Sequence, residues 1–214
     1  MNPALLKPPL LIACLVPLVH YAWGAHSDTL GIDPVEGLRR GLGIWALNFL
    51  LITLAVTPLR KYSGWAWLGR LRRMLGLFAF FYATLHLLSY LWLDQSFALT
   101  AMAVDIAKRP FIIAGLIAFI MLLPLALTSN AYAVGKLGGR RWLELHRSVY
   151  LIAMLALAHM AWMTEAGPGK PLLYALALAI LLGLRIHWRV QELRYQQAGG
   201  IKRRRRVIPV ILKK

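Results

Sequence analysis

Six long apolar runs divide the sequence, and they restrict the chain to folds that lie in a lipid bilayer. A helix needs about 20 apolar residues to cross the hydrocarbon core. Hydrophobic residues make up 59% of the chain and charged residues 15%, which is too apolar for a soluble domain of 214 residues. We therefore predict an all-α integral membrane protein built as a six-transmembrane-helix bundle. The expected spans are Leu10–Trp23, Gly43–Leu59, Met74–Leu93, Pro110–Leu127, Leu145–Met163 and Pro171–Trp188.

The connections between the runs are short and leave no room for a soluble domain. We expect residues 10–190 to form one transmembrane domain between an N-terminus of residues 1–9 and a basic tail of residues 191–214. The first run is short enough to resemble a cleaved signal peptide. Its Pro17 and Tyr21 suit a retained helix better.

Lysine and arginine are concentrated in alternate connections. Four segments hold 20 of the 25 basic residues, and the three other loops hold six of the eight acidic residues. Cytoplasmic loops carry the excess of Lys and Arg. The charge pattern therefore predicts that both termini are cytoplasmic. The four basic segments are the N-terminus with Lys7, residues 60–73, residues 129–147 and the tail from Arg185.

The net charge of +17 does not indicate nucleic-acid binding, because the basic residues lie between apolar runs rather than on a soluble face with stacking aromatics. The tail cluster Lys202–Arg206 can contact anionic membrane lipid or act as a solvated topology anchor. The single cysteine, Cys14, excludes an internal disulfide and a site built from several cysteine ligands. Lipid is thus an expected partner and nucleic acid is not.

Two histidines on different predicted helices are expected at the same depth. His86 lies about 18 Å from the cytoplasmic start of the third helix, and His159 lies about 20 Å beyond the start of the fifth. One haem iron takes two imidazoles from opposite sides, and ligation satisfies rings that otherwise lack polar partners in lipid. We therefore predict that His86 and His159 are axial ligands of a haem. The alternatives are interhelical hydrogen bonding, or a proton or metal path through a small transporter or channel.

His146 is a weaker candidate ligand at the cytoplasmic end of the fifth run. A second haem there would need a partner about four turns before His86, where the sequence has Arg72 and Arg73. Arginine does not ordinarily ligate iron. His146 is therefore either a ligand of a possible second haem or a capping histidine at the headgroup level.

Several short segments together resemble the MsrQ (formerly YedZ) family of the ferric-reductase-like transmembrane superfamily. The similarity covers about residues 28–190. The segments are Gly31–Val35, Thr57–Leu59, Arg72–Leu77, Thr84–Tyr90, Arg109–Pro110 and Lys136–His146 with the later His159.

The resemblance implies an electron-transfer subunit of an oxidoreductase complex in the bacterial cell inner membrane, rather than the sulfoxide-reducing catalytic subunit. Such a subunit passes electrons from the quinone pool through one or two haem b groups to MsrP, a periplasmic molybdopterin methionine sulfoxide reductase. The family is also associated with FMN. The superfamily's histidine ligands map onto His86, His146 and His159, and an arginine at position 72 or 73 replaces the remaining one.

The electron donor can also be considered from the residues. Ferric reductases and NADPH oxidases use a soluble flavin and nicotinamide domain to supply their haems, and no such domain is legible in these 214 residues. We therefore expect a donor dissolved in the membrane, which favours quinol. A haem nearer the outer leaflet would direct electrons toward the periplasm.

Overall fold

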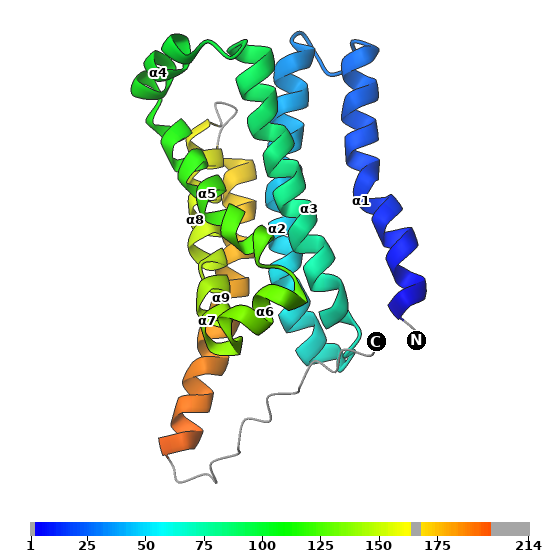
Figure 1. The fold of residues 1–214 in the computed structure, drawn as a ribbon, viewed down its shortest axis with the longest axis vertical. Helices are drawn as coiled ribbons and strands as arrows, with labels where there is room; N and C mark the ends of the chain where they lie inside the picture. Colours follow the sequence, from blue (N-terminus) through cyan, green and yellow to red (C-terminus); the bar gives the residue numbers. More distant parts are fainter. Residues whose placement is uncertain (1–2, 164–167, 198–214) are drawn as a thin grey trace.

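The protein is a bundle of long helices, and its computed structural model describes residues 3–163 and 168–197. Figure 1 shows α1, α2, α3, α5, α8 and α9 running along the same axis. No strand occurs in these two ranges, which confirms the predicted all-α class. The helices are α1 (Pro3–His26), α2 (Pro34–Ser63), α3 (Leu68–Ser89), the π-helix η1 (Tyr90–Asp94), α4 (Leu99–Lys108), α5 (Pro110–Leu127), α6 (Ala131–Leu137), α7 (Gly139–His146), α8 (Val149–Met163) and α9 (Gly169–Gln197).

Five of the described helices are long and apolar enough to cross a membrane: α1, α2, α3 with η1, α5 and α9. The protein is therefore a multi-pass membrane protein. The fifth predicted run is not one continuous helix, because α7 ends at His146 and α8 begins only at Val149. The Ser148 hydroxyl donates to the Leu145 carbonyl at this break, 2.7 Å away. With 15 described residues, α8 leaves the sixth span a prediction.

The two ends of the bundle differ, which gives a reference for the site. Helix α4 and the α1–α2 connection lie at the same end of the bundle, on opposite sides of it, and α6 and α7 lie toward the other end (Figure 1). We call these the α4 end and the α7 end. The expected cytoplasmic loops 60–73 and 129–147 both lie at the α7 end, and the predicted tail cluster Lys202–Arg206 and the acidic Glu165 lie outside the described residues.

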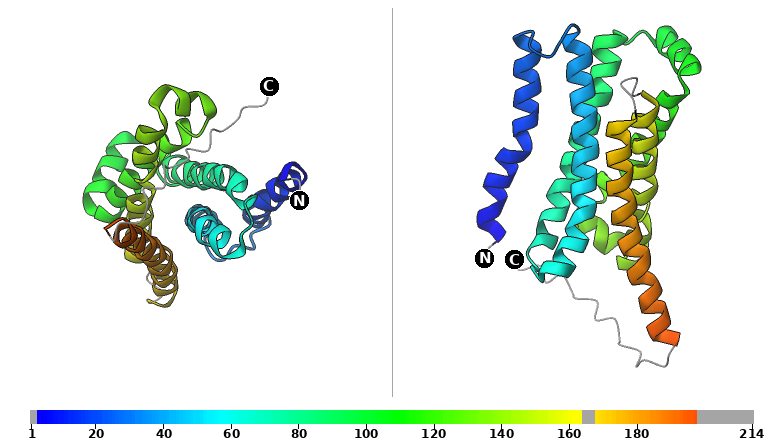
Figure 2. Two further views of the ribbon diagram at one scale, coloured as in Figure 1. Left: turned by 90° about the horizontal axis from the view of Figure 1, so that it is seen from below. Right: turned by 180° about the vertical axis from the view of Figure 1, so that it is seen from behind.

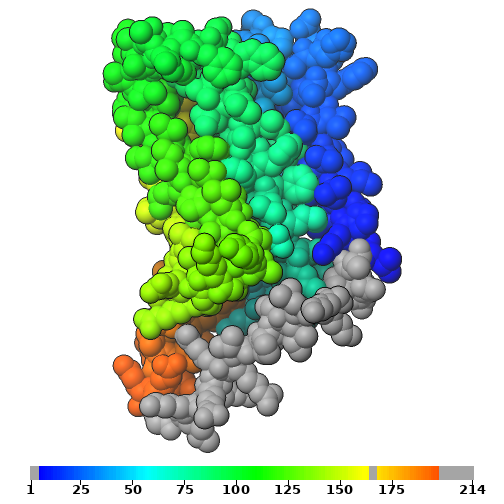
Figure 3. Space-filling view, viewed as in Figure 1, coloured from blue at the N-terminus to red at the C-terminus, as the bar shows by residue number. Residues whose placement is uncertain are grey.

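Helix α2 forms the centre of the bundle. It begins at a strong N-cap, where Asp33 accepts the backbone N–H groups of Val35 and Glu36, and it ends at Gly64, whose φ of 71° favours glycine. In the two turned views α2 and α3 lie side by side, with α1 on one flank and α8 and α9 on the other (Figure 2). The space-filling view shows α3 and α5 packed together along most of one face (Figure 3).

The core joins α2, α3 and α8 through large apolar side chains. The Phe49 ring of α2 stacks on Tyr82 of α3 with ring centres 5.2 Å apart. Leu54, Tyr82 and Ile152 are the largest fully buried side chains among the described residues. Many apolar side chains on the outer surface of the bundle are exposed, as expected for helices surrounded by lipid.

The Tyr82 hydroxyl bridges two backbone groups of α1, and this helix bends visibly in Figure 1. In a regular helix the Leu18 N–H would donate to the Cys14 carbonyl. Here the Tyr82 hydroxyl stands between them: it accepts from the Leu18 N–H at 3.0 Å and donates to the Cys14 carbonyl at 2.8 Å. Pro17 lies at this break, and an inserted side chain is a common companion of a kink. The hydroxyl thus fixes α1 to α3 one turn before His86.

Candidate metal centre between α3 and α8

His86 of α3 and His159 of α8 face each other inside the bundle. Their ring centres are 6.1 Å apart and the ring planes cross at 70°. The residues are 73 positions apart in sequence, and the pairing requires α3 and α8 to lie at matched depth. The sequence placed these histidines at similar depths, and the structure brings them together. Their role as ligands stays a prediction.

Each of the two histidines is held by a backbone carbonyl of a neighbouring helix. His86 Nδ1 lies 3.0 Å from the Arg39 carbonyl oxygen on α2, and His159 Nδ1 lies 2.8 Å from the Phe111 carbonyl oxygen on α5. A carbonyl can only accept, so in both rings Nδ1 carries the proton. In a neutral imidazole the other nitrogen, Nε2, then keeps its lone pair. A metal-ligating histidine is normally held in this way.

A glycine completes the support of each ring. Gly43 lies four residues after Arg39, and Gly115 lies four residues after Phe111. A Cβ on Gly43 would lie 3.0 Å from His86 Cε1, and a Cβ on Gly115 would lie 2.9 Å from His159 Cε1. The missing side chains let the imidazoles lie against the helix backbones. Two different helices therefore offer the same support: a carbonyl, and a glycine one turn later.

The donor set and the spacing fit the two axial positions of a haem. A transition-metal ion bonds imidazole nitrogen at about 2 Å and that nitrogen lies about 1 Å from the ring centre, so two imidazoles on one ion have centres about 6 Å apart. The separation of 6.1 Å agrees. Within the described ranges no group of three or more His, Cys, Asp or Glu side chains could hold a metal ion. Two imidazoles without further protein ligands suit an ion that a macrocycle already coordinates.

His146 lies apart from this pair, at the end of α7. Its Nδ1 lies 3.1 Å from the Trp142 carbonyl and its ring stacks on the Trp142 indole, with centres 3.9 Å apart. Its Nε2 is buried and has no hydrogen-bond partner in the described part of the chain. Arg72 of α3 and the Leu125 backbone of α5 lie nearby. His187 of α9 accepts from the Gln191 amide instead and is exposed.

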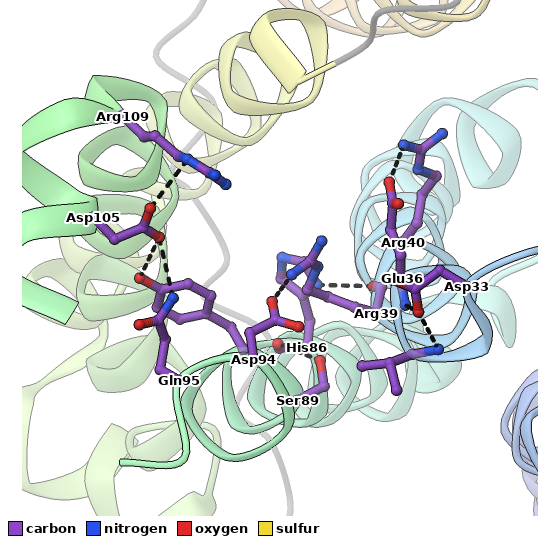
Figure 4. A network of polar contacts seen from close by, with 12 residues as sticks. Asp33, Glu36, Arg39, Arg40, His86, Ser89, Asp94, Gln95, Asp105 and Arg109 are labelled. Carbon is purple, nitrogen blue, oxygen red and sulfur yellow. Dashed lines mark hydrogen bonds and ion pairs between the residues drawn. The ribbon is translucent and has the colours of Figure 1, made fainter. Parts of the chain in front are cut away.

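Charged side chains form a network at the α4 end, around His86 (Figure 4). Three arginines pair with carboxylates: Arg39 with Asp94, Arg40 with Glu36 at 2.5 Å, and Arg109 with Asp105 at 3.1 Å. Asp105 also accepts from the Tyr90 hydroxyl at 3.0 Å. The ion pair of Arg39 differs from the others because the backbone of the same residue supports His86.

Sequence reasoning found the histidines but missed the residues that support them. Gly43 entered the sequence analysis only as the start of a predicted span, and Gly115 had no assigned role. Both are glycines inside apolar helices, which usually have a packing or functional reason. That signal would have identified both positions, although not the rings that they face.

The fold and the paired histidines define the class of protein, and comparisons with known sequences agree. Residues 42–157 match the family described as "Ferric reductase like transmembrane component". The chain belongs to the MsrQ family within this class. It is 56% identical over 188 residues to the "Protein-methionine-sulfoxide reductase heme-binding subunit MsrQ" of Azospira oryzae, covering 87% of this chain and 79% of that protein. It is 48% identical to the Herminiimonas arsenicoxydans protein of the same name, over 88% and 87% of the two chains.

Proposed function

We propose that the protein is a haem b electron-transfer subunit and that His86 and His159 are the axial ligands of its haem. The observation that carries the proposal is their matched geometry. Both Nδ1–H groups are engaged by carbonyls, both Nε2 atoms keep a lone pair, and the ring centres are 6.1 Å apart. The relatives' name, heme-binding subunit, supports it. When bound, the haem supplies a one-electron carrier inside the bilayer.

The residues of the chain bind and orient the group. Arg39 and Phe111 fix the histidine tautomers through their carbonyl oxygens, and Gly43 and Gly115 allow the rings to approach the helices. The apolar core keeps water away and so restrains side reactions of a reduced carrier.

We further propose one haem rather than two. His146 Nε2 has no hydrogen-bond partner among the described residues, and the nearby charged residue is Arg72, which does not ordinarily ligate iron. If the purified protein carries two haems, His146 is the residue to test as a ligand of the second. FMN is proposed from the family resemblance alone, and no residue is assigned to it.

The proposed electron route runs from quinol in the membrane to MsrP, a periplasmic molybdopterin reductase that repairs oxidised methionines. The relatives' name, which places them in a protein-methionine-sulfoxide reductase, supports the acceptor. The route implies a bacterial inner-membrane protein of six spans with both termini cytoplasmic and the α4 end facing the periplasm. The histidine pair then lies nearer the periplasmic side, on the side of the acceptor.

Purification in detergent after expression with ample haem tests the cofactor. We expect a reduced-minus-oxidised spectrum of b-type haem that His86→Ala and His159→Ala each abolish or strongly reduce. His187→Ala is the matched control and should retain the haem, because this side chain is exposed. A colourless wild-type protein, or haem retained in both ligand variants, would refute the proposal.

The route needs its own test. The purified protein, reduced by a short-chain quinol, should be fully reoxidised by a catalytic amount of the partner reductase only when methionine sulfoxide is present. Orientation can be read from cysteines introduced into a Cys14→Ala background, with a membrane-impermeant thiol reagent. Ser27→Cys at the α4 end should react in cells whose outer membrane alone is permeabilised, and Ser63→Cys at the α7 end should react only after lysis. The reverse pattern would overturn the orientation.

A further inference from the structure

Arg39 contacts the segment that carries His86 at two points. Its backbone carbonyl accepts the His86 Nδ1–H, and its guanidinium forms an ion pair with Asp94 (Figure 4). His86 and Asp94 lie on one continuous stretch, the end of α3 followed by η1. One residue of α2 therefore holds the ring and the helix end beyond it.

The π-helix explains how Asp94 reaches this position. In a regular α-helix, a residue eight positions after His86 would lie about 80° further round the axis. The wider π turn reduces the rotation per residue, and π segments are frequent at functional sites. In η1 the wider turn brings the Asp94 carboxylate back toward the helix side that His86 occupies, where Arg39 meets it.

The ion pair differs from an ordinary surface pair in its surroundings and connections. The Arg39 and Asp94 side chains are 21% and 19% exposed, whereas the neighbouring pair of Arg40 and Glu36 is 57% and 43% exposed and lies within one helix. Exposed pairs contribute little to stability. The pair of Arg39 and Asp94 instead joins two elements, and its guanidinium belongs to the residue whose carbonyl sets the direction of His86 Nε2.

We propose that Arg39 and Asp94 are positioning residues for His86: their ion pair holds α2 against η1 and so keeps the Arg39 carbonyl on His86 Nδ1. This inference rests on the proposed function, in which His86 binds haem iron. Loss of either charged partner loosens the same carbonyl-to-imidazole contact. A loosened contact weakens the orientation of His86 and its basicity as a ligand.

The test compares Arg39→Gln and Asp94→Asn with the matched controls Arg40→Gln and Glu36→Gln in the purified full-length protein. The readouts are the rate of haem loss to excess apomyoglobin, the electron paramagnetic resonance spectrum of the ferric haem and its midpoint potential. We expect haem affinity to fall about 10-fold in Arg39→Gln and Asp94→Asn, the usual effect of losing an outer-shell partner of a metal ligand. The controls should match the wild type.

The sign of the change in the haem midpoint potential distinguishes a positioning role from a purely electrostatic effect of the charges. Removing a positive charge and removing a negative charge shift the potential in opposite directions if only electrostatics matters. A loosened ligand shifts it the same way in both variants. The double variant Arg39→Gln/Asp94→Asn should be no worse than either single one, because both act through one contact. Arg39→Lys, which can keep the ion pair, should restore most of the affinity.

Several outcomes would overturn the proposal. One is a loss of haem affinity in Arg39→Gln but not in Asp94→Asn, which would indicate a direct contact between Arg39 and the haem. Opposite potential shifts, or additive losses in the double variant, would indicate independent charge effects. His86→Ala is measured in parallel: if it retains haem, the proposed function is wrong. If it loses haem while Arg39→Gln and Asp94→Asn match the controls, only the positioning role is wrong.

Discussion

Replacing Gly43 by alanine should separate haem binding from helix stability. The new Cβ would lie 3.0 Å from Cε1 and 3.1 Å from Nδ1 of His86. Ordinary contacts of this kind begin near 3.4 Å, so the ring must move by a few tenths of an ångström. Its Nδ1 is 3.0 Å from the Arg39 carbonyl oxygen. The same displacement lengthens this distance to about 3.2 Å or more, the upper limit of a normal hydrogen bond.

The magnitude follows from the same geometry. Displacing or weakening this support of a ligand costs about 10-fold or more in metal affinity. Alanine is meanwhile the better helix former in a helix interior, by roughly 1 kcal/mol relative to glycine. We therefore expect Gly43→Ala to bind haem about 10-fold or more weakly, and so to be purified with less of it, while the haem-free bundle keeps its stability or gains some. Gly115→Ala, whose Cβ would lie 2.9 Å from both Cε1 and Nδ1 of His159, should do the same.

The assay is the haem-to-protein ratio and absorbance spectrum of each purified variant, together with its thermal unfolding in detergent without haem. Gly183→Ala in α9 is the matched control, because no atom lies within 4 Å of its new Cβ. Gly76→Ala, which makes only an ordinary contact of 3.6 Å with Thr53, is a second one. Full haem content and unchanged spectra in both Gly43→Ala and Gly115→Ala would refute the proposed ring supports.

Three other substitutions test further parts of the fold and site. Tyr82→Phe removes the hydroxyl that bridges Leu18 and Cys14 in α1. The free energy of unfolding, measured by thermal unfolding, should fall by about 1–3 kcal/mol, because two backbone groups lose a partner. An unchanged stability would mean that the two α1 groups bond each other directly. His146→Ala should leave the haem-to-protein ratio and spectrum unchanged, whereas a fall from two haems to one would establish a second site. Asn48→Ala removes the acceptor of the Tyr174 hydroxyl and should cost about 1 kcal/mol in unfolding in detergent, with no change in the haem spectrum; a spectral change would place this pair at the haem.

The sequence was sufficient to predict the all-α class, five long apolar helices and the meeting of His86 with His159, because these depend on features that act along one helix. Apolar length predicted the spans, and a fixed rise per residue placed His86 and His159 together. The same reasoning predicted one continuous helix over Leu145–Met163, whereas α7 ends at His146 and α8 begins at Val149. Ser148 and the turn there satisfy backbone carbonyls locally, and hydropathy does not record such bonds.

The contacts between helices could not be predicted in the same way. The rotation of α2 and α5 decides which carbonyls the histidines meet, and side-chain packing across the whole bundle sets that rotation. The insertion of Tyr82 into α1 and the wide turn of η1 also depend on neighbours that are distant in sequence. A single residue such as Gly115 signals a close approach, but not the identity of what approaches.

The three candidate histidines differ in the residues that contact their rings. His146 has its hydrogen-bonded carbonyl and its stacking ring within its own helix, both on Trp142 four residues earlier. The backbone of Leu125 on α5 also lies near its ring. His86 and His159 take their orientation only when α2 packs on α3 and α5 packs on α8. The geometry of the His86 and His159 pair is thus a property of the assembled bundle, and a ligand that binds both rings must stabilise the packing of four helices at once by mass action.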